Sequence, residues 1–384
     1  MLLCLRLTRP IGICSGKGTV ARYLVDHHGF RHVSVQSNAS KAQQEQGISS
    51  EAETNVSNTY QKRPSGTALV FPTSDKLLEY VTQRWRERWV TADVMSKEAL
   101  DAYSRRPFFL LISVDAPLLV RWKRYQKRKQ ELASSTEQST EPVTKSLPDS
   151  QQAYPAEALE DFVTLSDAQL YHPETGQATH ISSAPVRLLN TSSSLAHLYV
   201  NLGKLDLLST ERLRPGWDNY FMTLASLAAR RSNCMKRRVG CVVVSHNRRV
   251  ISTGYNGTPR GIRNCGEGGC SRCNQGLGSG HGLATCLCIH AEENALLEAG
   301  RDRLREGAVL YCDTCPCLTC SIKIAQVGIS EVVYAHGYSM DTDTAAVFRE
   351  AGVRLRQFVP VSLVFPSSSY PVFSHPALAD LPRL

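Results

Sequence analysis

The segment "HAEENALLEAG" at residues 290–300 places an imidazole and a carboxylate two positions apart where a helical apolar pattern begins. A second segment, "PCLTC" at residues 316–320, places two cysteines three positions apart at the start of another expected helix. Side chains three apart lie on one face of a helix, so both thiols are expected to point the same way. Proline favours the first helical position, and a helix amino terminus stabilises thiolates. The strand-like run "AVLYC" between the two segments indicates alternating strands and helices, which is typical of an α/β fold.

These residue types match a catalytic zinc site. His290, Cys317 and Cys320 offer one nitrogen and two sulfurs, which leaves the fourth tetrahedral position of a zinc ion for water. Zinc lowers the pKa of such a water to about 7, and Glu292 is placed to move protons, which contributes about 10²–10⁴-fold in rate. The other interpretation is a closed structural zinc site made of Cys312, Cys315, Cys317 and Cys320. It leaves His290 and Glu292 without a role, and two cysteine pairs separated by one residue do not easily face one ion.

The distribution of cysteines supports metal binding. The chain has 13 cysteines, of which 11 lie at or after Cys234. Closely spaced cysteines without a secretion signal indicate metal sites rather than a disulfide framework.

The motif H-x-E followed by P-C-x-x-C is the signature of zinc nucleobase deaminases. Residues 254–261 ("GYNGTPRG"), 286–302 and 310–338 resemble the deoxycytidylate (dCMP) deaminase family, and the resemblance extends over residues ~213–360. It implies the cytidine-deaminase fold, an α/β/α sandwich. It also implies zinc-dependent hydrolysis of dCMP to dUMP and ammonia, activation by dCTP and inhibition by dTTP. Mg²⁺ would accompany these effectors, and the enzyme would be a homo-oligomer, commonly a hexamer.

The resemblance assigns individual residues. His290, Cys317 and Cys320 match the zinc ligands, and Glu292 matches the proton shuttle. Other positions match contacts to substrate or effector: Asn256, Gly257, Arg260, Asn294, Arg301 and Tyr338. The glycine-rich loop with Arg260 offers backbone N–H groups and a cation for a 5′-phosphate. Two of these residues also have structural interpretations, because Asn-Gly is a turn dipeptide and a tyrosine can belong to the core.

The remaining cysteines favour a second, structural zinc. Some members of the family carry such a site, and Cys234, Cys265 and Cys288 align with its ligands, with His281 as a fourth. The alternative ligand set is Cys270, Cys273, Cys286 and Cys288. Buried free thiols are the third interpretation.

The segment "GICSGKGTVARYL" near the amino terminus resembles the phosphate-binding loop of nucleotide kinases. The matching residues are Gly12, Gly16, Lys17, Gly18 and Thr19. The motif G-x₄-G-K-[ST] requires glycine at position 11, where the chain has Ile11, and Gly18 separates Lys17 from Thr19. We therefore expect a P-loop kinase-like parallel-sheet domain without kinase activity. Extensions of this kind occur in fungal members of the deaminase family, which implies a fungal origin.

Composition suggests the domain limits. Residues 36–66 and 131–155 are rich in Gln, Ser, Glu and Thr and are expected to be disordered insertions. We expect a kinase-like domain over residues 1–208, a deaminase domain over residues 209–360 and a tail over residues 361–384.

The net charge of +9 suits phosphate-bearing partners. The basic runs lie mostly outside the deaminase segment, and no aromatic platform for bases is evident, so nucleic acid is the less favoured substrate. The alternatives to dCMP deamination are editing of cytosine or adenine in nucleic acid, a regulatory nucleotide sensor, and a kinase that uses Lys17.

The sequence has no apolar run long enough for a membrane span, and residues 1–14 are interpreted as a buried strand. We expect a cytoplasmic protein, with the nucleus as a second location.

Overall fold

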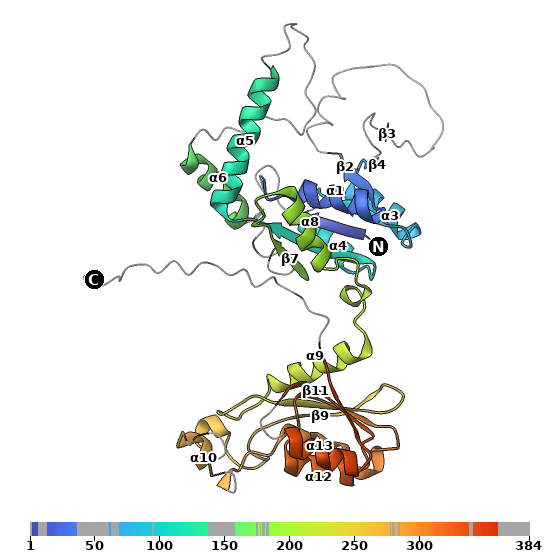
Figure 1. Ribbon diagram of the computed structural model, residues 1–384, viewed down its shortest axis with the longest axis vertical. Helices are drawn as coiled ribbons and strands as arrows, with labels where there is room; N and C mark the ends of the chain where they lie inside the picture. Colours follow the sequence, from blue (N-terminus) through green and yellow to red (C-terminus); the bar gives the residue numbers. More distant parts are fainter. Residues whose placement is uncertain are drawn as a thin grey trace, which may run out of the picture. The chain divides into compact units, whose positions relative to one another are not determined.

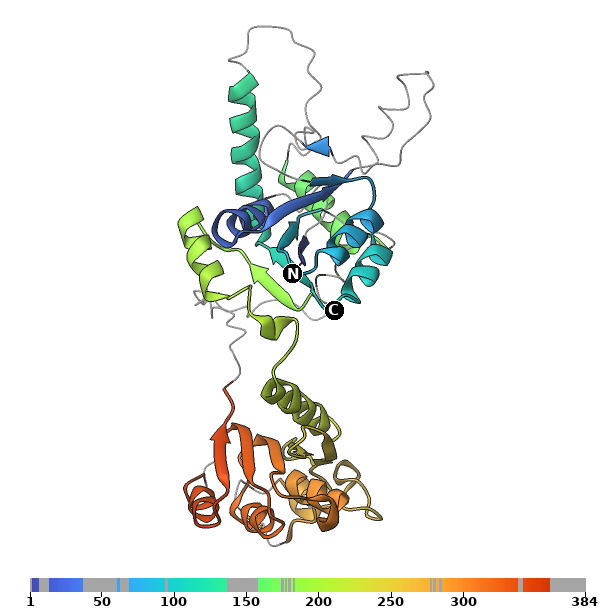
Figure 2. The same cartoon turned by 90° about the vertical axis from the view of Figure 1, so that its right-hand side faces the viewer.

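The computed structural model describes two compact units, residues 1–214 and residues 215–384. The described residues are 2–6, 14–36, 61–62, 69–93, 96–136, 158–173, 176, 178, 181, 184–276, 278, 281–282, 285–337 and 341–359. Figure 1 labels many of the elements, and Figure 2 shows the same chain from the side. The boundary expected from the sequence follows residue 208, whereas the two units divide after residue 214. The expected tail over residues 361–384 lies outside the described residues.

The first unit contains a seven-stranded sheet with the strand order β3-β4-β2-β5-β1-β6-β7. Its neighbouring strands are parallel except for the antiparallel pair of β3 and β4. The strands are β1 (Leu2–Arg6), β2 (Arg31–Val35), β3 (Gln61–Lys62), β4 (Leu69–Phe71), β5 (Trp89–Thr91), β6 (Phe109–Asp115) and β7 (Val186–Leu189). The connecting helices are α1 (Lys17–His28), α3 (Ser74–Gln83), α4 (Lys97–Ser104), α5 (Leu118–Thr136), α6 (Leu159–Tyr171) and α8 (Leu195–Lys204).

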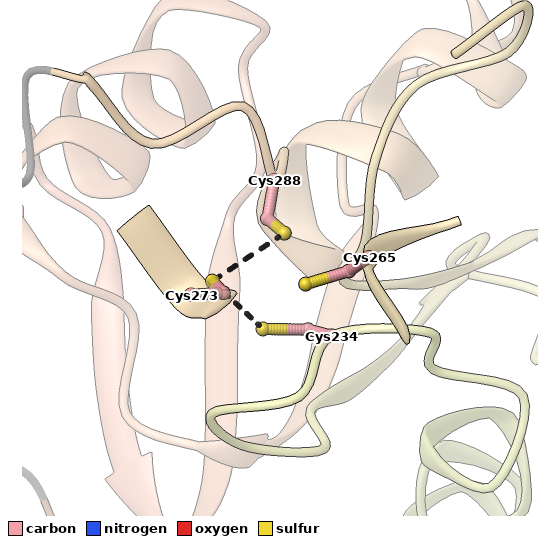
Figure 3. A group of neighbouring side chains, drawn as sticks. All are labelled: Cys234, Cys265, Cys273 and Cys288. Atoms are coloured by element: carbon pink, nitrogen blue, oxygen red, sulfur yellow. Dashed lines mark hydrogen bonds between the residues drawn. The ribbon is translucent and has the colours of Figure 1, made fainter. Parts of the chain in front are cut away.

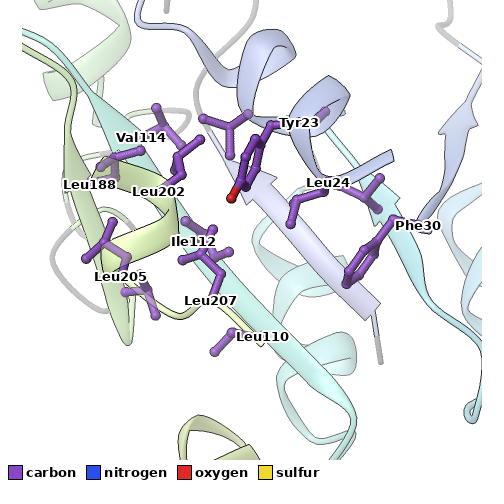
Figure 4. Packing of buried hydrophobic residues seen from close by; sticks show 14 of the residues in the cluster. Tyr23, Leu24, Phe30, Leu110, Ile112, Val114, Leu188, Leu202, Leu205 and Leu207 are labelled. Atoms are coloured by element: carbon purple, nitrogen blue, oxygen red, sulfur yellow. The ribbon is translucent and has the colours of Figure 1, made fainter. Parts of the chain in front are cut away.

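Strand β6 shows why this sheet needs continuous apolar segments. Leu110, Ile112 and Val114 belong to the core formed with α1 and α8, which Figure 4 shows. Phe109 and Leu111 pack instead against the core formed with α3 and α4. Successive side chains of a strand point to opposite faces, so a strand covered on both faces is apolar at every position.

The structure differs from the sequence interpretation at the two expected insertions. Gln61–Lys62 form the short strand β3, and helix α5 continues to Thr136. The rest of these two segments, apart from Gln36, lies outside the described residues. Helix α6 was not expected; its Phe162 ring lies 5.2 Å from the ring centroid of Trp122 and 5.4 Å from that of Tyr125. An aromatic cluster therefore holds α6 against α5.

The second unit contains a five-stranded sheet with the strand order β12-β11-β10-β8-β9. Strand β8 is antiparallel to β9 and β10, while β10, β11 and β12 are parallel. The strands are β8 (Gly240–Val244), β9 (Val250–Tyr255), β10 (Val309–Thr314), β11 (Glu331–His336) and β12 (Arg354–Gln357). The α-helices are α9 (Trp217–Ala229), α10 (Ser271–Asn274), α11 (Ala291–Ala299), α12 (Leu318–Gln326) and α13 (Asp341–Glu350).

Helices cover both faces of this second sheet. Cys241 and Val243 of β8 pack in a core with residues of α11, α12 and α13. Val242 and Val244 of the same strand pack with residues of α9 on the other face. This arrangement is the α/β/α sandwich that the sequence predicted for the second unit.

Two glycines let helices approach this sheet closely, one on each face. A Cβ on Gly254 of β9 would lie 2.1 Å from the Ala291 carbonyl oxygen in α11. A Cβ on Gly240 of β8 would lie 2.0 Å from the Ala225 carbonyl oxygen in α9. Gly254 therefore sets the distance between the sheet and the amino-terminal turn of α11.

Among the described residues, no helix combines the length and apolar character that crossing a bilayer requires.

Candidate metal centre

The first part of the site is the start of helix α11. His290 is the N-cap residue, with an extended backbone (φ −81°, ψ 159°). Its N–H donates to the Glu293 carboxylate at 3.2 Å, and the same carboxylate pairs with Lys323 of α12. This ion pair ties together the two helices that carry the predicted zinc ligands.

The second part of the site is the start of helix α12. Cys317 is the N-cap residue (φ −77°, ψ 169°), and the helix begins at Leu318. Pro316 therefore lies two residues before the helix rather than at its first position. Its carbonyl accepts a hydrogen bond from Thr344 of α13 at 2.9 Å, which holds the extended turn in place. The later start leaves the Cys317 sulfur on the turn, where it faces His290.

The three predicted ligand atoms converge. His290 Nδ1 lies 3.3 Å from the Cys317 sulfur and 3.3 Å from the Cys320 sulfur. All three atoms lie within 4.8 Å of one another. A tetrahedral zinc ion with its usual bond lengths would separate nitrogen and sulfur ligands by about 3.6 Å. The residues present therefore fit zinc with little rearrangement.

The environment of this group also favours a thiolate. Hydrogen bonds from Cys320 and His290 lower the pKa of the Cys317 thiol to about 3, against the opposing effect of burial. Among the described residues, Cys312 and Cys315 belong to no metal-binding group with Cys317 and Cys320. Cys312 is instead buried on β10, where it interacts with Cys241. The alternative of a closed four-cysteine site is not supported.

Glu292 lies on the first turn of α11 and is only 4% exposed. Burial raises the pKa of its carboxyl to about 7. Near neutral pH such a carboxyl can both accept and release a proton, which is what a general acid–base group needs. Perturbed carboxyl groups of this kind are common in functional sites.

Glu292, His290 and Cys317 line a cavity of about 330 Å³. Its volume falls in the range usual for small-molecule sites, about 300–1,000 Å³. Lys236, Arg237 and Arg272 also line it and supply positive charge. None of these three cations was expected in the site. Lys236 and Arg237 belong to the basic run Arg230–Arg238, which has the pattern of an ordinary solvated segment, and Arg272 lies outside that run.

The predicted contact residue Asn256 also lines the cavity, and it is buried. Its Oδ1 accepts hydrogen bonds from the Ser232 hydroxyl at 2.7 Å and the Val239 N–H at 2.8 Å. Its Nδ2 donates to the Arg237 carbonyl at 2.8 Å. Asn256 therefore holds the wall of the cavity together, including the residues next to Lys236.

Next to Asn256, Gly257 pairs with Ile289, one residue before His290. Asn294 lies two residues after Glu292 in α11, and its Nδ2 donates to the Tyr255 carbonyl of β9 at 2.9 Å. These two residues fix the start of α11 against β9 and the loop that follows it.

The other predicted contacts lie elsewhere. Arg260 and Arg301 are exposed and are not among the residues that line the cavity. Tyr338 lies outside the described residues.

A second group of cysteines lies close to the cavity. Six of them cluster together: Cys234, Cys265, Cys270, Cys273, Cys286 and Cys288. Figure 3 shows four of these side chains with their sulfurs turned toward one another. His281 belongs to neither metal-binding group of this cluster, and its carbonyl accepts a hydrogen bond from Arg272 at 2.7 Å. The structure thus does not place the His281 ring with the cysteines.

The glycine-rich turn of the first unit is closely packed. Gly16 is the N-cap of α1 (φ 101°), and a Cβ there would lie 2.4 Å from Asn190 Nδ2. Lys17 donates to the Ala92 carbonyl at 3.2 Å, and Arg124 of α5 donates to the Cys14 carbonyl at 3.0 Å. Gly18 and Thr19 lie in the first turn of α1, while Gly12 lies outside the described residues.

Comparison with known proteins identifies relatives of both units. Residues 215–336 match the family model described as cytidine and deoxycytidylate deaminase zinc-binding region. The deoxycytidylate deaminase of Schizosaccharomyces pombe is 47% identical over 354 residues, which cover 92% of this chain and 97% of the relative. The deoxycytidylate deaminase of Saccharomyces cerevisiae is 43% identical over 293 residues, which cover 74% of this chain and 85% of the relative. The dCMP deaminase of the cyanophage S-TIM5, solved by crystallography in complex with dCMP and dUMP, has 31% sequence identity to this chain, and the superposed structures give a TM-score of 0.30. That alignment covers 36% of this chain and 94% of the phage protein.

Proposed function

The chain belongs to the deoxycytidylate deaminase family, and we propose that the residues of the metal centre convert dCMP and water into dUMP and ammonia. The second unit has the cytidine-deaminase-like fold of that family. One observation carries the proposal: His290 Nδ1 and the sulfurs of Cys317 and Cys320 converge beside the buried Glu292. Hydrolytic deamination of a pyrimidine requires this combination of zinc ligands and a carboxyl group.

His290, Cys317 and Cys320 would hold the catalytic zinc. When bound there, zinc supplies a water of lowered pKa as nucleophile. Glu292 accepts a proton from this water and delivers it to N3 of the cytosine ring as oxygen adds at C4. Glu292 then takes the remaining proton from the hydroxyl added at C4 and passes it to the C4 amino group, which leaves as ammonia while the C4 carbonyl of dUMP forms. A carboxyl with a pKa near neutrality is suited to both transfers.

We propose that Lys236 and Arg237 bind the 5′-phosphate of dCMP. Both line the cavity that contains Glu292, whereas Arg260, the cation that the sequence suggested, does not. Cations near a phosphate lower KM by stabilising the bound nucleotide, and they do not take part in bond cleavage. Asn256 remains a proposed substrate contact because it lines the same cavity.

Substitution of the two cations tests this assignment. Lys236→Met together with Arg237→Met should raise KM for dCMP and leave kcat nearly unchanged. Arg260→Met is the matched control, because it removes an exposed cation of the neighbouring loop. Deoxycytidine, which lacks the phosphate, should show no difference between the variants. If Arg260→Met alone raised KM for dCMP, the phosphate assignment would have to move back to the glycine-rich loop.

Regulation and assembly are further parts of the proposal. By family resemblance, dCTP activates and dTTP inhibits, with Mg²⁺ bound to the triphosphates. Arg301, Asn294 and Tyr338 are the residues proposed for effector or nucleotide contacts, and the assembly proposed is a homo-hexamer. The proposed location is the cytoplasm, with the nucleus as a second location. Nucleic acid is the alternative substrate, and an assay of ammonia release with dCMP, single-stranded DNA and RNA side by side distinguishes the two.

For the first unit we propose a P-loop kinase-like fold that no longer transfers phosphate. Strand β1 lies between β5 and β6, so the turn into α1 is at the point where the strand order reverses, the usual place for nucleotide sites. That turn is occupied by protein groups, since Arg124 contacts Cys14 and Lys17 contacts Ala92. The proposal predicts no phosphate transfer from ATP. Transfer to a nucleotide or to dephospho-CoA that Lys17→Ala abolishes would show that the unit is an active kinase.

A further inference from the structure

The six clustered cysteines come from separate segments of the second unit. Cys234 follows α9, Cys265 begins the 3₁₀ helix η3 (Cys265–Glu267), and Cys270 and Cys273 flank the start of α10. Cys286 and Cys288 precede α11. The packing of the unit brings all six sulfurs into one cluster.

The sulfurs form two groups of four rather than one group of six. In each group every sulfur lies within 4.8 Å of the other three. One group contains Cys234 and Cys265, and the other contains Cys270 and Cys286; Cys273 and Cys288 belong to both. If each group is taken as the four corners of one tetrahedron of ligands, the two tetrahedra share the edge between Cys273 and Cys288.

The distances fit zinc better than disulfides. Cys273 lies 3.9 Å from Cys288 along the shared edge, Cys234 lies 4.0 Å from Cys273, and Cys270 lies 3.9 Å from Cys286, each measured between sulfurs. Four thiolates around one zinc at the usual bond length stand about 3.8 Å apart. A disulfide would require about 2.05 Å. These three sulfur–sulfur distances, which include edges of both groups, thus have the length that a zinc ion needs.

The second tetrahedron also carries signs of charged sulfurs. Arg272 is 8% exposed, and its Nη1 lies 3.8 Å from the Cys286 sulfur. Burying a guanidinium is unfavourable unless an anion compensates it. The Leu287 N–H donates to the Cys270 sulfur at 3.4 Å, as a backbone donor does to a thiolate. One zinc in the first tetrahedron would leave Cys270 and Cys286 as thiols, so the Cys286 sulfur 3.8 Å from the Arg272 guanidinium would carry no charge.

We propose that these six cysteines bind two zinc ions in a binuclear cluster, with Cys273 and Cys288 as bridging thiolates. Six thiolates and two Zn²⁺ ions carry a net charge of −2, which Arg272 partly neutralises. The cluster would fix loops that contain little regular structure, and through Cys288 it would hold the chain two residues before His290. The proposal stands on the sulfur geometry and Arg272 and does not depend on the reaction at Glu292.

The full-length protein tests the proposal by its metal content. Native mass spectrometry and elemental analysis should find three zinc ions per chain, one at His290 and two in the cluster. X-ray absorption at the zinc edge should show a zinc–zinc scattering path, which only a shared edge provides. Two zinc ions per chain without that path would overturn the proposal, and this measurement needs no variant.

Variants then assign the ions. Cys270→Ser with Cys286→Ser should remove one zinc and leave two, whereas Cys273→Ser should remove two. Cys14→Ser, a thiol of the first unit, is the control and should keep all three. If Cys270→Ser with Cys286→Ser kept the zinc content of the parent protein, the second tetrahedron would not be a metal site. Three zinc ions in a chain inactive on dCMP would count against the reaction and leave the cluster standing.

Discussion

Replacing Gly254 with alanine should move the catalytic groups without altering any of them. The added Cβ would meet the Ala291 carbonyl oxygen at 2.1 Å and the Ala295 nitrogen at 2.5 Å. Ordinary contact begins at 3.4 Å, so the first turn of α11 must move by about 1.3 Å, the difference between 3.4 and 2.1 Å. Ala291 lies between His290 and Glu292, so both would move. A displacement of about 1 Å can lower the rate by about 10²-fold, and overpacking typically costs about 1–3 kcal/mol of stability.

Gly240→Ala is the matched control. Its Cβ would meet the Ala225 carbonyl oxygen at 2.0 Å, an equal clash against α9 on the other face of the sheet. Helix α9 carries none of the proposed site residues. Urea unfolding should show a similar loss of stability in both variants. With both variants folded and loaded with zinc, only Gly254→Ala should lose about 10²-fold in kcat for dCMP. Equal turnover by the two variants would refute the claim that Gly254 positions the site.

Three further predictions concern charged groups of the second unit. Glu292→Gln should retain the parent zinc content and lose about 10²–10⁴-fold in turnover, measured as ammonia release at equal zinc. In the metal-free protein, the raised pKa of Glu292 means that its contribution to stability is present below the ordinary glutamate pKa of 4.5 and is lost as the pH rises through about 7. Between about pH 4 and pH 8, the free energy of unfolding of the metal-free parent protein should fall by up to about 3 kcal/mol relative to that of Glu292→Gln, as measured by urea unfolding. Parallel pH profiles of the unfolding free energy in the two proteins would contradict this. Arg356 donates hydrogen bonds to Asp218 at 2.7 Å and to Glu331 at 3.0 Å. Arg356→Met should therefore lower the free energy of unfolding by about 1–3 kcal/mol, while KM and zinc content stay unchanged.

Elements with many apolar residues were the most predictable part of the fold. Strand β6 is apolar at successive positions because two cores cover it, and this leaves a clear run in the sequence. Helix α6 was missed because it follows a polar segment and is anchored largely by one residue, Phe162. Strand β3 has two residues, too few for any pattern, and its pairing with β4 depends on a long-range contact.

The candidate site shows the same division between local and long-range information. Each half of the His290 and Cys317–Cys320 group is a local motif, so the sequence could suggest that the halves meet. Lys236 and Arg237 reach the cavity only because of how the chain folds between α9 and β8, and a basic run alone does not reveal that. The grouping of six cysteines likewise depends on the packing of separate segments, so the sequence left two ligand sets open. In the structure Cys273 takes the place that was expected for His281 in the first set, so the two observed groups of four share Cys273 and Cys288.

The most direct test is to incubate the purified full-length protein with dCMP and measure dUMP and ammonia, beside Glu292→Gln and a Cys317→Ser variant. We expect equal amounts of the two products from the parent protein. Glu292→Gln should keep the normal zinc content with turnover lower by about 10²–10⁴-fold, and Cys317→Ser should lose one zinc and all activity. Near-parental dUMP formation by Glu292→Gln at equal zinc would contradict the proton transfers assigned to this carboxyl.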